Sequence, residues 1–451
     1  MRKLAEWKQS THKPLLILGA RQTGKTWLME TFGKEHYENA VHIELENSPE
    51  MQEIFKTVTD PLRIIRMLEI YSGKNIDPEN SLLILDEIQE VPKALSALKF
   101  FNEKAPEFHI MAAGSYLGTN LHRSQSFPVG KVEVLHLKPM SFTEFLLACG
   151  QKGLADFLEK RSIEDAQIFA DRFNQMLRYY YFVGGMPEAV QTFVQTQDLS
   201  KVRQVQNMLL SQYRADFSKH IPGSEIPQVN MVWDSVPVQL AKENRKFVYS
   251  QMKSGARSKE FETAIQWLCD TGLLHRVFRI EKPYMPLSAY EDPKAFKLYF
   301  LDIGLLGAMA GLQEAMVLSD SIFFTEFKGA LSEQFVLQEL TLQTEFIFYW
   351  FHPRSTGEVD FVIQADGRAW PLEVKSGKNV QSKSLKAFLE KYNLPDGLRL
   401  SLLPYKKQDW LINYPLYFAG QILAFIAPPA KTASAVLPLD ISSDVSAKNR
   451  E

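Results

Sequence analysis

The sequence has 451 residues and a mass of 51.7 kDa, so at roughly 150 residues per domain we expect about three folding units. Apolar residues make up 45% of the chain and charged residues 23%, which excludes collagen-like, coiled-coil and wholly disordered chains. The 51 basic and 53 acidic residues give a net charge of −2, so any contact with nucleic acid has to come from a local patch.

The two cysteines, Cys149 and Cys269, lie far apart in the sequence, which excludes a disulfide framework and a cysteine-rich zinc site. The N-terminal residues MRKLAEWKQS lack the apolar segment of a signal peptide. No stretch reaches the roughly 18 apolar residues of a membrane span. We therefore expect a cytoplasmic protein without membrane contact.

Five short apolar runs, separated by more polar, helix-like segments, occur in the first 140 residues. Short apolar runs that alternate with helices are typical of a parallel sheet buried on both faces. We expect an α/β domain with a five-stranded parallel sheet over residues 1–141. The runs are at residues 15–18, 41–45, 81–86, 108–114 and 132–137.

The first run leads into GARQTGKT, residues 19–26, a complete G-x-x-x-x-G-K-T between a predicted strand and a predicted helix. Gly19 and Gly24 allow the backbone to wrap phosphates, Lys25 reaches the β and γ phosphates, and Thr26 ligates Mg²⁺. This motif predicts a P-loop NTPase that binds ATP with Mg²⁺. The other loop residues assigned to the nucleotide site are Ala20, Arg21, Gln22 and Thr23.

Two acidic residues, Asp86 and Glu87, follow the third apolar run, at the sheet edge where open α/β folds bind ligands. Asp86 is expected to hold the Mg²⁺ shell, while Glu87 either polarises the attacking water or is a solvated helix-cap acid. Ser115, after the fourth run, either senses the γ-phosphate or the water, or caps its own turn. For Arg21, both a nucleotide contact and a pairing with an acid near Glu46 remain open.

The hydrophobic pattern divides the rest of the chain into four parts. Long amphipathic stretches predict a helical lid, a small helical unit then closes with the strand-like runs LLHRVFRI and FKLYFLD, and a third unit mixes helices with strands. The final Pro-, Ala- and Ser-rich stretch is expected to be disordered. These parts cover residues 142–228, 229–323, 324–427 and 428–451, respectively.

In the third unit, Asp360 and the triplet Glu373-Val374-Lys375 lie on two predicted strands, which a turn at residues 365–368 folds into a hairpin. Two carboxylates and a lysine form the D…E-x-K pattern of metal-dependent nucleases, in which the acids hold Mg²⁺ and Lys375 orients or activates water. Glu333 stands on the apolar face of a predicted helix and needs a metal or a lysine as its partner.

We therefore predict one metal site from Glu333, Asp360 and Glu373, with Lys375 beside it as a catalytic residue. The alternative is a solvated strand edge in a unit that keeps the fold for binding only.

Seven segments together resemble a large prokaryotic family of AAA-type ATPases whose C-terminal half is a domain of unknown function related to restriction endonucleases. The resemblance implies an ATPase core, a winged-helix-like middle and a restriction-endonuclease-like α/β end. Where the family usually has an arginine before the fifth strand, this chain has Lys131, which lacks the fork for a bidentate γ-phosphate contact. The segments are GARQTGKT, LLILDEIQ, LKPMSFTEF, YFVGGMPEAV, YRADFSKH, FKLYFLDIGLL, and GEVDFVI with EVKSG.

The middle unit carries Lys253, Arg257 and Lys259, which are suited to a phosphate backbone. Nearby acids at positions 260, 262 and 270 disfavour a DNA groove, so we favour a protein-contact or coupling module.

The leading hypothesis is an ATP-hydrolysing molecular switch that repositions the nuclease-like unit, with DNA as one partner left open. The alternative is a signalling or scaffold protein that holds ATP while its C-terminal unit binds a protein partner without cleavage.

Overall fold

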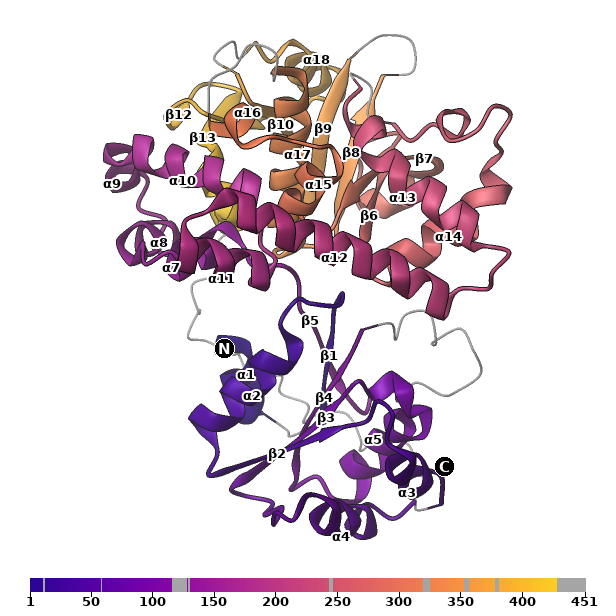
Figure 1. Cartoon of the computed structure of the whole chain (residues 1–451). Coiled ribbons are helices and arrows are strands. Elements are labelled where there is room, and N and C mark those ends of the chain that lie inside the picture. The colour runs from indigo at the N-terminus through magenta and orange to yellow at the C-terminus, as the bar shows by residue number, and fades with distance from the viewer. Residues whose placement is uncertain are drawn as a thin grey trace, which may run out of the picture.

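The computed structural model describes residues 1–10, 13–57, 59–115, 128, 130–242, 246–318, 325–352, 357–377 and 381–427. These residues form two bodies (Figure 1). The smaller body contains the first five strands, and the larger body holds the helices and strands that follow. Helix α12 (Leu199–His220) runs along the side of the larger body that faces the smaller one.

The smaller body contains a five-stranded sheet in the order β2-β3-β4-β1-β5, with every pair parallel. Each strand coincides with one of the predicted apolar runs, which confirms the predicted five-stranded parallel sheet. The strands are β1 (Leu15–Leu18), β2 (Asn39–Glu44), β3 (Ser81–Asp86), β4 (His109–Gly114) and β5 (Glu133–His136).

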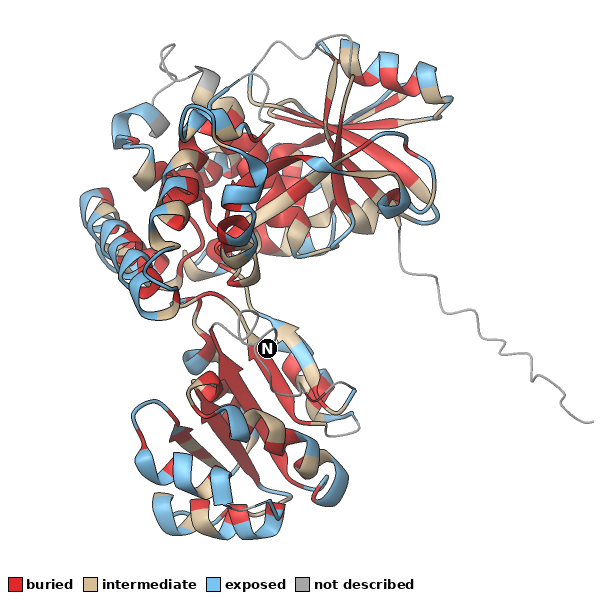
Figure 2. Ribbon diagram, turned by 90° about the vertical axis from the view of Figure 1, so that its right-hand side faces the viewer, coloured by how far each residue is buried: buried red, intermediate tan, exposed pale blue. Residues whose placement is uncertain are grey.

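Helices cover both faces of this sheet because successive strand residues point to opposite sides. Leu82 and Ile84 pack with α1 and α2, whereas Leu83 and Leu85 pack with the other three helices. Both sets are fully buried, and Figure 2 shows the strands as the buried centre of the body. The helices are α1 (Arg2–Lys8), α2 (Lys25–His36), α3 (Pro49–Thr57), α4 (Pro61–Ser72) and α5 (Pro92–Lys104).

The larger body begins with the predicted helical layer. Its first helix starts with a capping box, in which Ser141 accepts a hydrogen bond from the Glu144 N–H and the Glu144 carboxylate accepts one from the Ser141 N–H. Helix α13 runs through residue 228, where the boundary between lid and middle unit was predicted. Besides α12, the helices are α7 (Phe142–Ala148), α8 (Lys152–Glu159), α9 (Ile163–Ile168), α10 (Ala170–Val183), α11 (Pro187–Thr196), α13 (Ile226–Leu240) and α14 (Ser258–Asp270).

A second, mixed sheet has eight strands in the order β12-β13-β11-β10-β9-β8-β6-β7. The β6–β7 hairpin was expected inside a middle unit. In the structure it extends this sheet, because β6 pairs in parallel with β8 and so provides hydrogen-bond partners for the backbone at the edge of β8. The strands are β6 (Leu274–Ile280), β7 (Glu291–Phe300), β8 (Ile347–Phe351), β9 (Glu358–Ala365), β10 (Arg368–Lys375), β11 (Gly397–Ser401), β12 (Lys406–Lys407) and β13 (Leu411–Pro415).

Helix α17 covers one face of the second sheet and shares a core with the helical layer, while α18 covers the other face. The predicted hairpin turn is present, with Asp366 and Gly367 both at positive φ. The remaining elements are α15 (Ile303–Met309), α16 (Glu314–Leu318), α17 (Thr325–Thr341), α18 (Lys383–Tyr392), α19 (Ile422–Ile426), and the 3₁₀ turns η1 (Ile88–Glu90), η2 (Tyr249–Gln251), η3 (Leu287–Tyr290) and η5 (Leu416–Gln421).

Within the described part of the chain, no helix combines the length and the apolar character that a bilayer crossing requires. The predicted disordered tail, residues 428–451, lies outside the described residues.

Candidate nucleotide-binding site

The phosphate loop connects β1 to α2 at the carboxyl edge of the first sheet. Gln22 and Gly24 adopt left-handed backbone conformations, with φ of 63° and 89°. Gly19 is required by a close approach, because a Cβ there would lie 2.3 Å from the Leu137 carbonyl oxygen. The predicted loop is therefore folded against the chain that leaves β5.

Lys25 is almost fully buried, and its ammonium donates to the carbonyl oxygens of Gly19 and Ala20, at 3.0 and 2.9 Å. Burial lowers the pKa of Lys25 to about 8, although Glu87 and Asp86 act in the opposite direction. A phosphate would offer this ammonium a stronger counter-charge than the two carbonyl groups do.

Thr26 and Asp86, the two residues predicted to hold Mg²⁺, are in direct contact. The Thr26 hydroxyl donates to Asp86 Oδ2 at 2.5 Å, and the Glu87 N–H donates to Asp86 Oδ1 at 2.9 Å. Burial favours the neutral acid, but hydrogen bonds from His42, Thr26 and Glu87 outweigh it and lower the pKa of Asp86. A charged carboxylate beside a hydroxyl is a donor set that Mg²⁺ accepts.

Two further residues of this site, His42 and Glu44 on β2, were missed from the sequence. His42 Nε2 lies 3.5 Å from Asp86 Oδ2, and His42 Nδ1 lies 3.1 Å from a Glu30 carboxylate oxygen. The nearby Asp86 carboxylate raises the pKa of His42. Ligand atoms of His42, Glu44 and Asp86 all lie within 4.8 Å of one another. The sequence shows that His42 and Glu44 are two residues apart on a predicted strand. It does not show that this strand pairs with β3 and so places both residues beside Asp86.

Glu87 begins the short η1 turn with a φ of 50°, and its side chain makes no capping hydrogen bond there. Gln89, also missed from the sequence, donates to the Glu87 carboxylate and accepts from the Ser115 N–H at 3.3 Å. The Ser115 hydroxyl is buried and has no hydrogen-bond partner among the described residues. The amide of Gln89 thus connects the predicted water-polarising acid to the predicted γ-phosphate sensor.

In the hairpin of the second sheet, Asp360 lies on β9 and Glu373 on the neighbouring strand β10. Asp360 accepts a hydrogen bond from the Val374 N–H at 2.7 Å, and Lys375 Nζ lies 2.8 Å from a Glu373 oxygen. Burial raises the pKa of Glu373, against the influence of Lys375. The second Glu373 oxygen is buried and has no hydrogen-bond partner in the described ranges. An ion or a water would satisfy it.

Glu333 does not join these two acids, which corrects the predicted three-carboxylate site. Val374 packs in the core on the α17 side, so its neighbour Glu373 points to the opposite face of β10. Glu333 instead accepts from the Tyr299 hydroxyl at 3.2 Å and lies 3.7 Å from Lys297 Nζ. Lys297, fully buried on β7, also pairs with Glu358 on β9, so the two carboxylates share this lysine.

Residues 11–146, which contain the phosphate loop and the Asp86–Glu87 pair, match the AAA domain family. We call this N-terminal part of the chain the AAA domain, after the family that it matches. Residues 174–315 match a domain of unknown function, DUF8612, and residues 328–417 match another, DUF4143. A comparison with curated proteins gives no match.

Solved structures with a similar chain course include a Walker-type ATPase of Pyrococcus abyssi, 15% identical, with 68% of this chain and 94% of that chain covered and a TM-score of 0.43. The Thermotoga maritima RuvB Holliday junction branch migration motor is 14% identical, with 61% and 85% covered and a TM-score of 0.28. Drosophila ORC bound to DNA is 12% identical, with 69% and 94% covered and a TM-score of 0.26. These values support no transfer of activity or ligand.

The AAA domain contacts the larger body through its phosphate loop. Arg21 pairs with Asp216 of α12 at 2.6 Å, and the Tyr213 hydroxyl donates to the Arg21 carbonyl at 2.7 Å. Ala20 packs into the hydrophobic core of the larger body. The acid that pairs with Arg21 therefore comes from the YRADFSKH segment rather than from the vicinity of Glu46.

A cavity of about 570 Å³ opens beside the loop, between the AAA domain and the larger body. Gly19, Thr23 and Ser115 line it from the AAA domain, and Gly272 and His275 line it from the other side. Burial, with Lys138 nearby, lowers the pKa of His275 to about 3, so this imidazole is neutral.

Two lysines considered in the sequence analysis form ion pairs with acidic residues. Lys131, at the position where the related family has arginine, lies 2.9 Å from Glu103 within the AAA domain. In the middle unit, Lys253 lies 3.6 Å from Glu260. This pairing reduces the positive field that the middle unit would present to DNA.

Proposed function

We propose that the AAA domain binds ATP with Mg²⁺ and hydrolyses it. The observation that carries the proposal is the meeting of Lys25, Thr26, Asp86 and Glu87 at the carboxyl ends of β1 and β3. Parallel strands deliver such residues to one edge, where loop N–H groups and a helix N-terminus favour phosphate. Mg²⁺ would be held by Thr26 and Asp86 and would neutralise phosphate charge there.

In this proposal each polar group of the site has one role. Lys25 exchanges its two carbonyl contacts for phosphate oxygens, and Glu87 accepts a proton from the attacking water. Gln89 holds the Glu87 carboxylate in place, and the Ser115 hydroxyl donates to the γ-phosphate or to the water. His42 orients Asp86, as a hydrogen-bonded partner commonly does for a metal-binding carboxylate.

The cavity beside the loop has a volume within the usual range for small-molecule sites, and it joins the phosphate loop at Gly19 and Thr23. We assign the nucleoside part of ATP to this cavity. Its walls come from both bodies, so a bound nucleotide would contact both.

The Arg21 contact supports a switch. Phosphate in the loop competes with Asp216 for the Arg21 guanidinium, so nucleotide binding or release changes the force on α12. This helix has 22 residues, about 33 Å of length, and it packs on α11, α13 and α15 of the larger body. ATP hydrolysis would thereby reposition the C-terminal sheet.

For that sheet we propose a nuclease-like role on DNA, with Asp360 and Glu373 as ligands for Mg²⁺ and Lys375 beside them. The alternative, a scaffold that binds a protein partner without cleavage, is favoured by one observation. Glu333 is engaged by Lys297 and Tyr299, which leaves two carboxylates where three were predicted.

One experiment with the full chain separates these proposals. ATP turnover is measured with Mg²⁺ and with a chelator, and loss of intact DNA is followed with Mg²⁺ or Mn²⁺, with and without ATP. Metal-dependent loss of DNA supports the nuclease. ATP turnover with intact DNA supports the scaffold, and absence of ATP turnover with Mg²⁺ contradicts the ATPase proposal.

A further inference from the structure

Three side chains with metal-ligating atoms meet at the carboxyl ends of β2 and β3. His42 and Glu44 lie two residues apart on β2 and therefore point to the same face of the sheet. Asp86 ends β3 and stands directly opposite Glu44 in the parallel register. One nitrogen of His42 and one oxygen from each carboxylate all lie within 4.8 Å of one another. Neighbours across two strands thus form a compact set of one nitrogen donor and two oxygen donors.

The imidazole of His42 has the orientation of a metal ligand. Its Nδ1 lies 3.1 Å from a carboxylate oxygen of Glu30 on α2, and its Nε2 lies 3.5 Å from Asp86 Oδ2. A carboxylate beside Nδ1 favours a proton on that nitrogen and leaves the lone pair of Nε2 on the side of Asp86. Metal-bound histidines commonly have this arrangement, with a carboxylate at one ring nitrogen and the ion at the other.

The Nε2 atom of His42 also needs a better partner than the described residues provide. It is buried, and no described residue gives it a well-formed hydrogen bond. A buried polar atom of this kind is usually satisfied by a water or an ion. Two atoms that bind one ion at about 2.1 Å and at a tetrahedral angle lie about 3.4 Å apart. The separation of 3.5 Å between Nε2 and Asp86 Oδ2 therefore suits two ligands of one ion.

The charges of the two carboxylates favour a cation here. Glu44 and Asp86 are neighbours across the strand pair, and like charges at directly opposed positions destabilise a sheet. Asp86 is almost fully buried, so water and salt screen its charge poorly. Glu44 is exposed, so its side chain can rotate to approach an ion. A divalent ion between the two carboxylates removes their repulsion.

The identity of the donors narrows the class of ion. Mg²⁺ prefers oxygen ligands, whereas an imidazole nitrogen together with carboxylates suits first-row transition metals. We propose that His42, Glu44 and Asp86 bind a divalent transition-metal ion in the absence of nucleotide. His42 then holds Asp86 through the ion. The proposal does not depend on ATP hydrolysis.

Mn²⁺ is the probe, and it is titrated into the full chain without nucleotide. Every protein in the series carries Asp360→Asn, which removes the candidate metal site of the second sheet. Electron paramagnetic resonance of the free ion gives the affinity. Electron spin-echo modulation from a nitrogen nucleus shows whether an imidazole is bound to the ion. In the parent protein we expect saturable binding with nitrogen modulation.

Two substitutions separate the nitrogen ligand from an oxygen ligand. His42→Gln should abolish the nitrogen modulation and weaken Mn²⁺ binding by roughly 10-fold or more, since even the loss of a residue that only orients a ligand costs about 10- to 100-fold. Glu44→Gln should also weaken binding but keep the modulation, because His42 is still present. His36→Gln and Glu46→Gln, at exposed positions close in sequence, are the matched controls and should bind Mn²⁺ like the parent protein.

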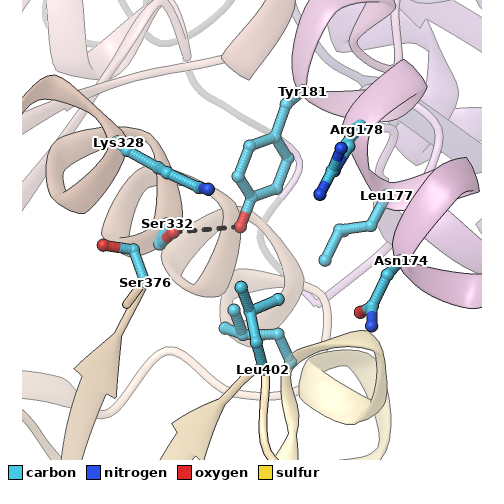
Figure 3. Close-up of a pocket in the computed structure, with 9 residues that line it drawn as sticks. Asn174, Leu177, Arg178, Tyr181, Lys328, Ser332, Ser376 and Leu402 are labelled. Atoms are coloured by element: carbon cyan, nitrogen blue, oxygen red, sulfur yellow. Dashed lines mark hydrogen bonds between the residues drawn. The ribbon is translucent and has the colours of Figure 1, made fainter. Parts of the chain in front are cut away.

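A variant in the larger body controls for a general loss of stability. There the Tyr181 hydroxyl donates to Ser332 Oγ at 3.2 Å, and Figure 3 shows this contact beside a small cavity. Tyr181→Phe removes a buried hydrogen bond and leaves the residues of the AAA domain unchanged, so it should keep both the affinity and the modulation.

Three results overturn the proposal: absence of saturable Mn²⁺ binding in the parent protein, absence of nitrogen modulation there, or equal affinity in His42→Gln. Because the titration contains no nucleotide, none of these results depends on whether the protein hydrolyses ATP.

Discussion

The guanidinium of Arg21, inside the phosphate loop, lies 2.6 Å from the carboxylate of Asp216, 195 residues later in the chain. Asp216 is buried, and Tyr213, one turn earlier on α12, donates to the Arg21 backbone. The loop that is expected to surround the nucleotide phosphates is therefore held directly by the larger body.

A double-mutant cycle on Arg21 and Asp216 should show coupling. Each alanine variant removes one charged partner from this contact and so lowers the free energy of unfolding. The sum of the losses in the two single variants should exceed the loss in the double variant by about 1–3 kcal/mol. Chemical denaturation measures this. The exposed Arg214–Asp234 pair is the control, for which we expect less than about 1 kcal/mol. Additive single effects at Arg21 and Asp216 would contradict the coupling.

Lys25→Ala should abolish measurable binding of ATP with Mg²⁺, because it removes the ammonium that bridges the phosphates. Calorimetry gives the result directly. Lys34→Ala, at an exposed position of the same helix, should bind like the wild type. Unchanged affinity in Lys25→Ala would refute the nucleotide site.

Glu87→Gln removes the carboxylate that polarises water and leaves Thr26 and Asp86 intact. Nucleotide binding should persist while steady-state ATP turnover falls by roughly 10²-fold or more. The exposed Glu79→Gln variant is the matched control and should keep full turnover. Equal rates in Glu87→Gln and the wild type would move the catalytic role to another residue.

Mn²⁺ should raise the melting temperature of the protein, and part of that rise should depend on Asp360. Asp360→Asn keeps an acceptor for the Val374 N–H and removes the charge that an ion requires. In Asp360→Asn the rise in melting temperature should be smaller by a few degrees. An ion present at about 100 times its dissociation constant stabilises the folded protein by about 2.7 kcal/mol, which corresponds to a shift of this size.

Two variants sharpen the interpretation of this Mn²⁺ effect. Asp366→Asn, in the exposed hairpin turn, should keep the full rise. Glu333→Gln should also keep it, because Glu333 contacts Lys297 rather than the two candidate ligands. Loss of the rise in Glu333→Gln would restore the three-carboxylate site.

Glu339 should make the unfolding free energy depend on pH. Burial raises its pKa from 4.5 to about 8, while the Phe142 N–H bond opposes this. The folded protein keeps a proton that the unfolded chain releases, so the contribution of Glu339 is complete below about pH 4.5 and is lost as the pH rises through about 8. Glu339→Gln should flatten this slope and, at pH 8, gain about 1–3 kcal/mol over the wild type.

Denaturation series at several pH values test this, with Glu159→Gln on the surface of α8 as a control that keeps the wild-type slope. An unchanged slope in Glu339→Gln would assign the pH dependence to other groups.

The sequence by itself determined the five parallel strands, the phosphate loop and the Asp86–Glu87 pair, because each depends on residues that are neighbours in the chain. Alternation and apolar runs report burial along a strand, and glycine and lysine spacing reports loop chemistry. The same local signals placed the hairpin that carries Asp360 and Glu373, since the Asp366-Gly367 turn sets its register.

Only the tertiary structure decided which side chains meet across long separations. It paired Arg21 with Asp216 and brought His42 to Asp86 through the β2–β3 register. It also gave Glu333 the buried Lys297, because β6 and β7 join the C-terminal sheet and carry that lysine under α17. A carboxylate on an apolar helix face must find a counter-charge, but which cation reaches it depends on strand order, and strand order is a property of the whole fold.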